Sequence, residues 1–96
     1  MMITFYRPKK DGSLNYYSIH NRQAHLFAKY CFIATYGIDQ QAGRERVYTF
    51  KTRIAMDRKL REIFNERIRG GYKVLYSYAK LPQYKEMFNE IKQKHA

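Results

Sequence analysis

The chain has 96 residues, a length that fits one domain with a modest core. Hydrophobic residues make up 45% of it, which excludes an intrinsically disordered chain. With 19 Lys and Arg against 8 Asp and Glu, the formal net charge is +11. Such an excess favours an anionic partner, of which nucleic acid is the commonest and an anionic membrane surface the next.

The single cysteine, Cys31, excludes a disulfide framework. Because it stands in an apolar run, it is predicted to be a small buried hydrophobic residue. The first residues lack the apolar core of a signal peptide, and no apolar run approaches the roughly 20 residues that span a bilayer. We therefore expect a soluble, cytoplasmic protein that has no membrane partner.

The first part of the chain is predicted to form a β-hairpin. Residues 2–7 and 14–20 both have strand composition, and the pair Asp11-Gly12 between them is a strong signal for a hairpin turn. Two lysines, Lys9 and Lys10, then lie at the tip of this hairpin.

A second hairpin is predicted to follow. Residues 27–36 form the most apolar strand, and because both of its faces are apolar it is expected to lie inside the sheet. Its partner is the strand 46–50, and the polar segment 37–43 forms the turn. Tyr36 is expected at the rim beside this turn, and Gly37 is expected to supply a bend or a positive-φ turn position.

The hydrophobic period then changes from 2 to 3.6, which predicts a helix capped by Thr52 and ended by the glycine pair at 70–71. Asp57 and Arg61 stand four residues apart on its charged face and are expected to pair. The apolar stripe of this helix is Met56, Leu60, Ile63, Phe64 and Ile68.

Residues 72–78 return to strand composition, and a short helix is predicted to begin at Pro82. The apolar stripe of that helix is Tyr84, Met87, Phe88 and Ile91. The order β-β-β-β-α-β-α predicts a single α+β domain over residues 1–96. In it a small antiparallel sheet packs against one long amphipathic helix and a short C-terminal helix.

Strand topology brings the candidate binding residues together. In an up-and-down antiparallel sheet, the first hairpin tip and the turn after Tyr36 lie at the same end, and the long helix runs back toward that end. Cations at this edge would pair with phosphates, and the aromatic ring would stack on a base or sugar. The alternative is that the charges are scattered and solvated and that Tyr36 closes the core. The candidate nucleic-acid-binding residues are Arg7, Lys9, Lys10, Tyr36, Gly37, Arg44, Arg46, Arg67 and Arg69.

No catalytic or metal-binding pattern is present in the sequence. The three histidines have no ligand spacing with Cys31 or with carboxylates, and no glycine-rich phosphate loop or nucleophile elbow occurs. We therefore expect no metal, no cofactor and no enzymatic activity.

The stretch Tyr36-Gly37-Ile38 resembles the Trp-Gly-Arg motif of the WGR domain family, which occurs in bacterial proteins and in poly(ADP-ribose) polymerases. The resemblance implies a small antiparallel sheet with one long helix across it, and DNA binding near a strand break. Tyr36 keeps a flat ring in place of Trp, whereas Ile38 lacks the Arg charge that relays a signal to a catalytic region. The supporting pattern covers residues 14–78 and comprises Tyr16-Tyr17, the strand 32–36, Gly43-Arg44, Tyr48-Thr49-Phe50, the amphipathic helix and Gly71-Tyr72.

Taken together, these patterns predict a non-catalytic domain that binds nucleic acid, DNA rather than RNA, chiefly through phosphates. Sequence specificity is expected to be low, because no helix directs Arg or Asn toward base edges. The alternative is a protein–protein interaction module whose basic surface docks an acidic partner or domain. A membrane-binding role ranks last, because the apolar stripe of the long helix is needed to cover the sheet.

Overall fold

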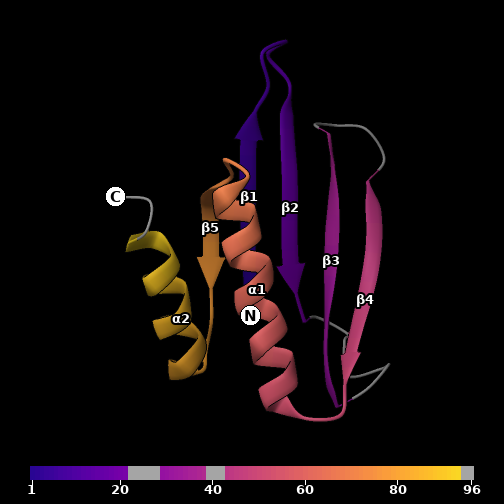
Figure 1. The fold of residues 1–96 in the computed structure, drawn as a ribbon, viewed down its shortest axis with the longest axis vertical. Helices are drawn as coiled ribbons and strands as arrows, with labels where there is room; N and C mark the ends of the chain where they lie inside the picture. The colour runs from indigo at the N-terminus through magenta and orange to yellow at the C-terminus, as the bar shows by residue number, and fades with distance from the viewer. Residues whose placement is uncertain (22–28, 39–42, 94–96) are drawn as a thin grey trace.

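The computed structural model describes residues 1–21, 29–38 and 43–93, which form a five-stranded antiparallel sheet and two helices (Figure 1). This architecture confirms the predicted α+β class. The strand order in the sheet is β4-β3-β2-β1-β5. In chain order the elements are β1 (Met2–Pro8), β2 (Leu14–His20), β3 (Tyr30–Ile38), β4 (Arg44–Phe50), α1 (Arg53–Arg69), β5 (Lys73–Tyr78) and α2 (Pro82–Gln93).

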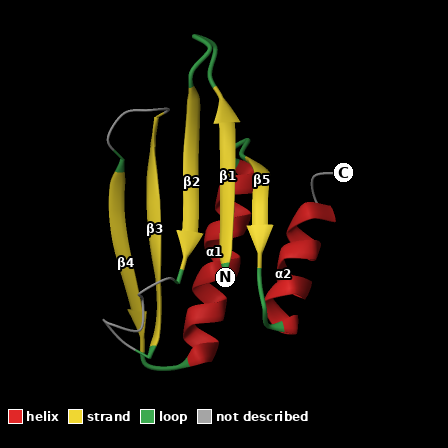
Figure 2. Cartoon of the chain, turned by 180° about the vertical axis from the view of Figure 1, so that it is seen from behind, coloured by secondary structure: helices red, strands yellow, loops and turns green. Residues whose placement is uncertain are grey.

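Both helices pack on the same face of the sheet, and Figure 2 shows the opposite face with neither helix across it. Successive side chains of a strand point to opposite faces, so alternate apolar residues meet the helices. Phe5 of β1 pairs with Tyr17 of β2, and Ile3 pairs with Ile19; all four are buried in the core. Both predicted helical stripes are buried there too, except Ile68, which is partly buried.

Local signals in the sequence fix the ends of several elements. Gly12 has φ +88°, and Asp11 accepts hydrogen bonds from Ser13, which closes the turn between β1 and β2. The Thr52 side chain accepts a hydrogen bond from the Ala55 amide at 3.2 Å and so caps α1.

Strand boundaries and neighbours differ in part from the expectation. β3 begins at Tyr30 rather than at residue 27, and the segment 22–28 lies outside the described residues, as does 39–42. β4 begins at Arg44 instead of residue 46. β3 is an interior strand, as predicted. The pairing of β5 with β1 was not predicted, because the local sequence pattern does not indicate it. Cys31 is buried, as expected.

The expected ion pair of Asp57 with Arg61 is wrong. Asp57 instead lies 3.7 Å from Arg53 and accepts a hydrogen bond from the Tyr84 hydroxyl of α2 at 3.1 Å. Arg61 bonds to Glu90 of α2 at 2.9 Å. The helix–helix contact therefore redirects both partners, because α2 offers groups that an isolated helix does not have.

Candidate nucleic acid interface

The predicted edge exists as one end of the molecule. β1 ends, β2 begins, β3 ends, β4 begins and α1 ends toward the same end of the sheet (Figure 1). This arrangement follows from the antiparallel order of the first four strands. Lys9 and Lys10 are exposed in the turn that projects beyond β1 and β2.

Arg7 joins the end of β1 to the end of α1. Its guanidinium donates a hydrogen bond to the Gly70 carbonyl at 2.9 Å, and Gly70 is the C-terminal cap of the helix. A cation at this position is favoured because the last carbonyls of a helix carry partial negative charge. The same guanidinium lies 4.7 Å from the centre of the Tyr72 ring.

Arg67, in the last turn of α1, contacts the same Tyr72 ring as Arg7. Its guanidinium carbon is 4.5 Å from the Tyr17 ring centre and 5.5 Å from the Tyr72 ring centre. Its Nε is buried and has no hydrogen-bond partner, so contacts with the rings position this guanidinium and no carboxylate does. Two positive charges are thus held around one tyrosine ring. An approaching anion would reduce the repulsion between them.

Tyr36 extends this set across the sheet. Its ring stacks on that of Tyr17, with 5.7 Å between the centres and 17° between the planes. In β4, Arg44 is the register partner of Tyr36, and strand alternation places both on the helix-bearing face. The successive neighbours form what we call the arginine–tyrosine row: Arg7, Tyr72, Arg67, Tyr17, Tyr36 and Arg44.

Tyr36 contributes to the core as well as to the rim. The residue is only partly exposed and packs against the hydrophobic core, because it lies on the same face as buried Ala34. Part of its ring is therefore buried against the core and is not available to a ligand. Arg44, its register partner, is exposed and is the more accessible group at this position.

The expectation for Gly37 is wrong. Gly37 lies within β3 and not in a turn, and among the described glycines only Gly12 and Gly71 have positive φ. Its register partner is Tyr16, on the face away from the helices, and the Tyr16 ring covers the space that a side chain would fill. Gly37 thus accommodates a neighbouring ring and is not part of the arginine–tyrosine row.

The other predicted cations surround the row without joining it. Arg46 stands next on the same face of β4, with its guanidinium 4.8 Å from the Tyr48 ring centre. Arg69 is exposed at the end of α1 and donates to the Asn65 carbonyl at 3.4 Å. Together with Lys9 and Lys10, these residues add positive charge around the same end.

Among the described residues, no carboxylate forms a salt bridge with a member of the arginine–tyrosine row. The salt bridges among the described residues are Arg53–Asp57, Lys59–Glu62 and Arg61–Glu90. None of them includes a member of the row. Asp11 lies in the hairpin tip, where hydrogen bonds from Ser13 lower the pKa of its carboxyl group. Burial raises the pKa of Tyr17, so the ring that Arg67 contacts carries no negative charge at neutral pH.

Sequence reasoning missed Tyr17 and Tyr72, the two rings that organise the row. Tyr17 lies on the same face of its strand as the core residue Ile19, so it was expected to face inward. The sequence did not indicate that Arg67 would contact its ring. Tyr72 follows directly on the glycine pair that ends α1, and only the fold brings Arg7 over its ring.

No family model, no curated protein and no solved structure matches this chain. Neither helix in the described part of the chain is long and apolar enough to cross a bilayer. At the site described above, guanidinium groups without a carboxylate partner among the described residues stand beside aromatic rings. Such groups suit the binding of an extended anion.

Proposed function

We propose that this protein is a non-catalytic nucleic-acid-binding domain, which binds DNA chiefly through phosphates and with low base specificity. The observation that carries the proposal is the arginine–tyrosine row, in which Arg7, Arg67 and Arg44 lie along one end of the molecule without an acidic partner among the described residues. Arginine forms bidentate hydrogen bonds with phosphate, and a net charge of +11 attracts a polyanion over longer range.

Low base specificity is part of the proposal because the row comes from strand ends and a helix end. Sequence reading in the major groove uses a helix or a β-ribbon whose side chains reach base edges. The exposed face of α1 engages in ion pairs of its own, including Lys59–Glu62 and Arg61–Glu90. Phosphate contacts fix the position of a nucleic acid without distinguishing its sequence.

The proposal also includes membership of the WGR family, which rests on the ordered sequence motifs over residues 14–78. By that resemblance, the ring at position 36 would face the end nucleotide of a broken strand. The Tyr36 ring already stacks on the Tyr17 ring. We therefore assign most of the binding free energy to the arginines and a smaller part to stacking on a nucleotide.

Fluorescence anisotropy of a labelled DNA duplex, measured between about 50 and 200 mM salt, tests the proposal. The variant Arg44→Gln/Arg46→Gln removes two exposed cations from the site. If both contact phosphates, the slope of log affinity against log salt should become shallower by about 1.8, from about 0.9 per phosphate on duplex DNA.

The matched control is Lys51→Gln/Arg58→Gln, which removes the same charge from exposed positions before and within the first part of α1. It should leave the slope close to that of the wild type. An absence of salt-sensitive binding to duplex, nicked and single-stranded DNA would overturn the proposal. Equal losses in the two variants would reduce it to an effect of net charge, and displacement of DNA by polyglutamate of equal charge would favour docking of an acidic protein.

A further inference from the structure

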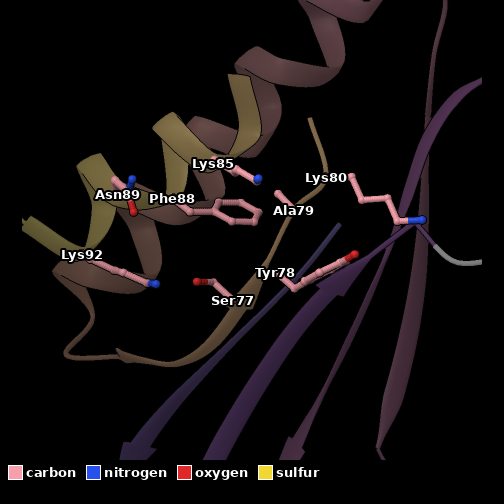
Figure 3. Close-up of a pocket in the computed structure, with 8 residues that line it drawn as sticks. All are labelled: Ser77, Tyr78, Ala79, Lys80, Lys85, Phe88, Asn89 and Lys92. Atoms are coloured by element: carbon pink, nitrogen blue, oxygen red, sulfur yellow. The ribbon is translucent and has the colours of Figure 1, made fainter. Parts of the chain in front are cut away.

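A second basic surface lies along the edge strand β5, between β5 and α2. The two elements border an open hollow of about 560 Å³. Figure 3 shows Lys85 and Lys92 projecting from α2 toward β5, with the Ser77 hydroxyl directed toward Lys92. We call this hollow the β5–α2 groove; its lining residues are Ser77, Tyr78, Ala79, Lys80, Lys85, Phe88, Asn89 and Lys92.

Helical spacing explains why the lysines face the groove. Lys85, Asn89 and Lys92 recur at intervals of four and three, so they share one face of α2. Phe88 lies on the same side and is buried, which fixes the orientation of the helix against the sheet. The acids Glu86 and Glu90 do not line the groove; they line an adjoining hollow together with Lys85 and Asn89, and Glu90 is bonded to Arg61.

The groove is positive and has no compensating acid in its described lining. Lys85 and Lys92 contribute two cations from α2, and neither takes part in a salt bridge among the described residues. Lys80 also lines the groove, but its amine is directed away from α2 (Figure 3). Ser77 and Asn89 add a hydroxyl and an amide, both of which donate hydrogen bonds to anionic oxygens. This combination suits a phosphate group.

Lys92 connects the β5–α2 groove with the arginine–tyrosine row. It also lines a neighbouring hollow together with Tyr6, Val74 and Lys73, the first residue of β5. Lys73 directly follows Tyr72, the ring that Arg7 and Arg67 contact. Positive groups therefore run along the whole edge strand, a path of roughly 20 Å for six residues in extended conformation.

Two tyrosines flank this path on the face that the helices leave open. Tyr76 pairs with Thr4 and Tyr78 pairs with Met2, which places both rings on the side opposite the buried residues Ile3 and Phe5. The two tyrosines are 52% and 49% exposed. Bases of a single strand are free to stack on such rings, whereas bases in a duplex are already stacked on each other.

We propose that the β5 edge binds a single strand of nucleic acid, with phosphates at Lys85 and Lys92 in the β5–α2 groove and bases on Tyr76 and Tyr78. This inference rests on the proposed function and adds a strand type to it. The arginine–tyrosine row would hold the adjoining part of the nucleic acid, so the favoured ligand is a duplex with a single-stranded extension.

The test compares anisotropy of labelled oligothymidylate and of a blunt duplex on the full chain. Lys85→Gln/Lys92→Gln should make the salt slope for oligothymidylate shallower by about 1.4, from about 0.7 per phosphate on a single strand, and should change the duplex slope little. Tyr76→Leu/Tyr78→Leu should weaken oligothymidylate binding roughly tenfold. The control Lys51→Gln/Arg58→Gln removes equal charge elsewhere and should leave the single-strand slope unchanged.

The outcomes separate this inference from the proposed function. If the wild type binds neither DNA, the proposed function fails. If it binds DNA and Arg44→Gln/Arg46→Gln weakens binding while Lys85→Gln/Lys92→Gln behaves like the control, the proposed function stands and the groove inference is overturned. Polyglutamate is a further competitor for the groove. If polyglutamate binds through Lys85 and Lys92 as tightly as oligothymidylate of equal charge, the groove inference is also overturned. All of these positions are exposed, and thermal unfolding of each variant verifies that the fold is retained.

Discussion

The ring of Tyr16 on β2 lies across Gly37 on β3, on the sheet face that the helices leave open. A Cβ atom at position 37 would stand 3.1 Å from the Tyr16 hydroxyl oxygen and 3.1 Å from the Gly43 Cα. The ring thereby covers backbone that a glycine would otherwise expose. The glycine of the Tyr-Gly-Ile stretch is accordingly explained by packing between strands.

Gly37→Ala is expected to destabilise the protein by about 1–2 kcal/mol, because the added methyl group must displace a ring or the backbone near Gly43. Urea unfolding measures the change in the free energy of unfolding. The cost should be smaller when the same substitution is made in a Tyr16→Ala background, since half of the conflict is then absent. An equal cost in both backgrounds would show that the ring is not the obstacle.

Tyr36→Ala is expected to lower the free energy of unfolding by about 2 kcal/mol, because the ring packs on the core and stacks on Tyr17. Tyr36→Phe keeps the ring and should retain most of the stability. Thermal or urea unfolding of the two variants gives the comparison. If Tyr36→Ala unfolded like the wild type and yet lost DNA binding, the ring would be a binding group with no part in the fold.

Stability is expected to fall at alkaline pH because burial raises the pKa of Tyr17 and of Tyr84 above the ordinary tyrosine value of about 10. In Tyr84 the carboxylate of Asp57 adds to this effect. The folded chain then holds protons that the unfolded chain has released. The contribution is fully present below about pH 10 and is lost as the pH rises above that value.

The urea midpoint should therefore decrease as the pH rises above about 10, and Tyr84→Phe should make the decrease shallower. The variant also loses the hydrogen bond to Asp57, so its stability at neutral pH should be somewhat lower. A pH dependence as steep in Tyr84→Phe as in the wild type would contradict the assignment to this hydroxyl.

Much of the fold was predictable because its signals are local. The turn at Asp11-Gly12 and the cap at Thr52 depend on a few neighbouring residues, and the structure contains both. Met56, Leu60, Ile63 and Phe64, which period 3.6 selects in α1, are buried, and Ile68 is partly buried. The convergence of strand ends and the end of α1 followed from antiparallel order, which the short connections of the β1–β2 and β3–β4 hairpins favour.

Sequence by itself determined the α+β class, the order of elements and the placing of positive charge at the end where four strand ends and a helix end meet. Only the tertiary structure decided that Arg67 contacts the ring of Tyr17, and that α2 turns Lys85 and Lys92 toward β5. The physical reason is that periodicity specifies which face of an element is apolar. Contacts between polar groups of distant elements depend on the relative position of those elements, which packing of the whole core sets.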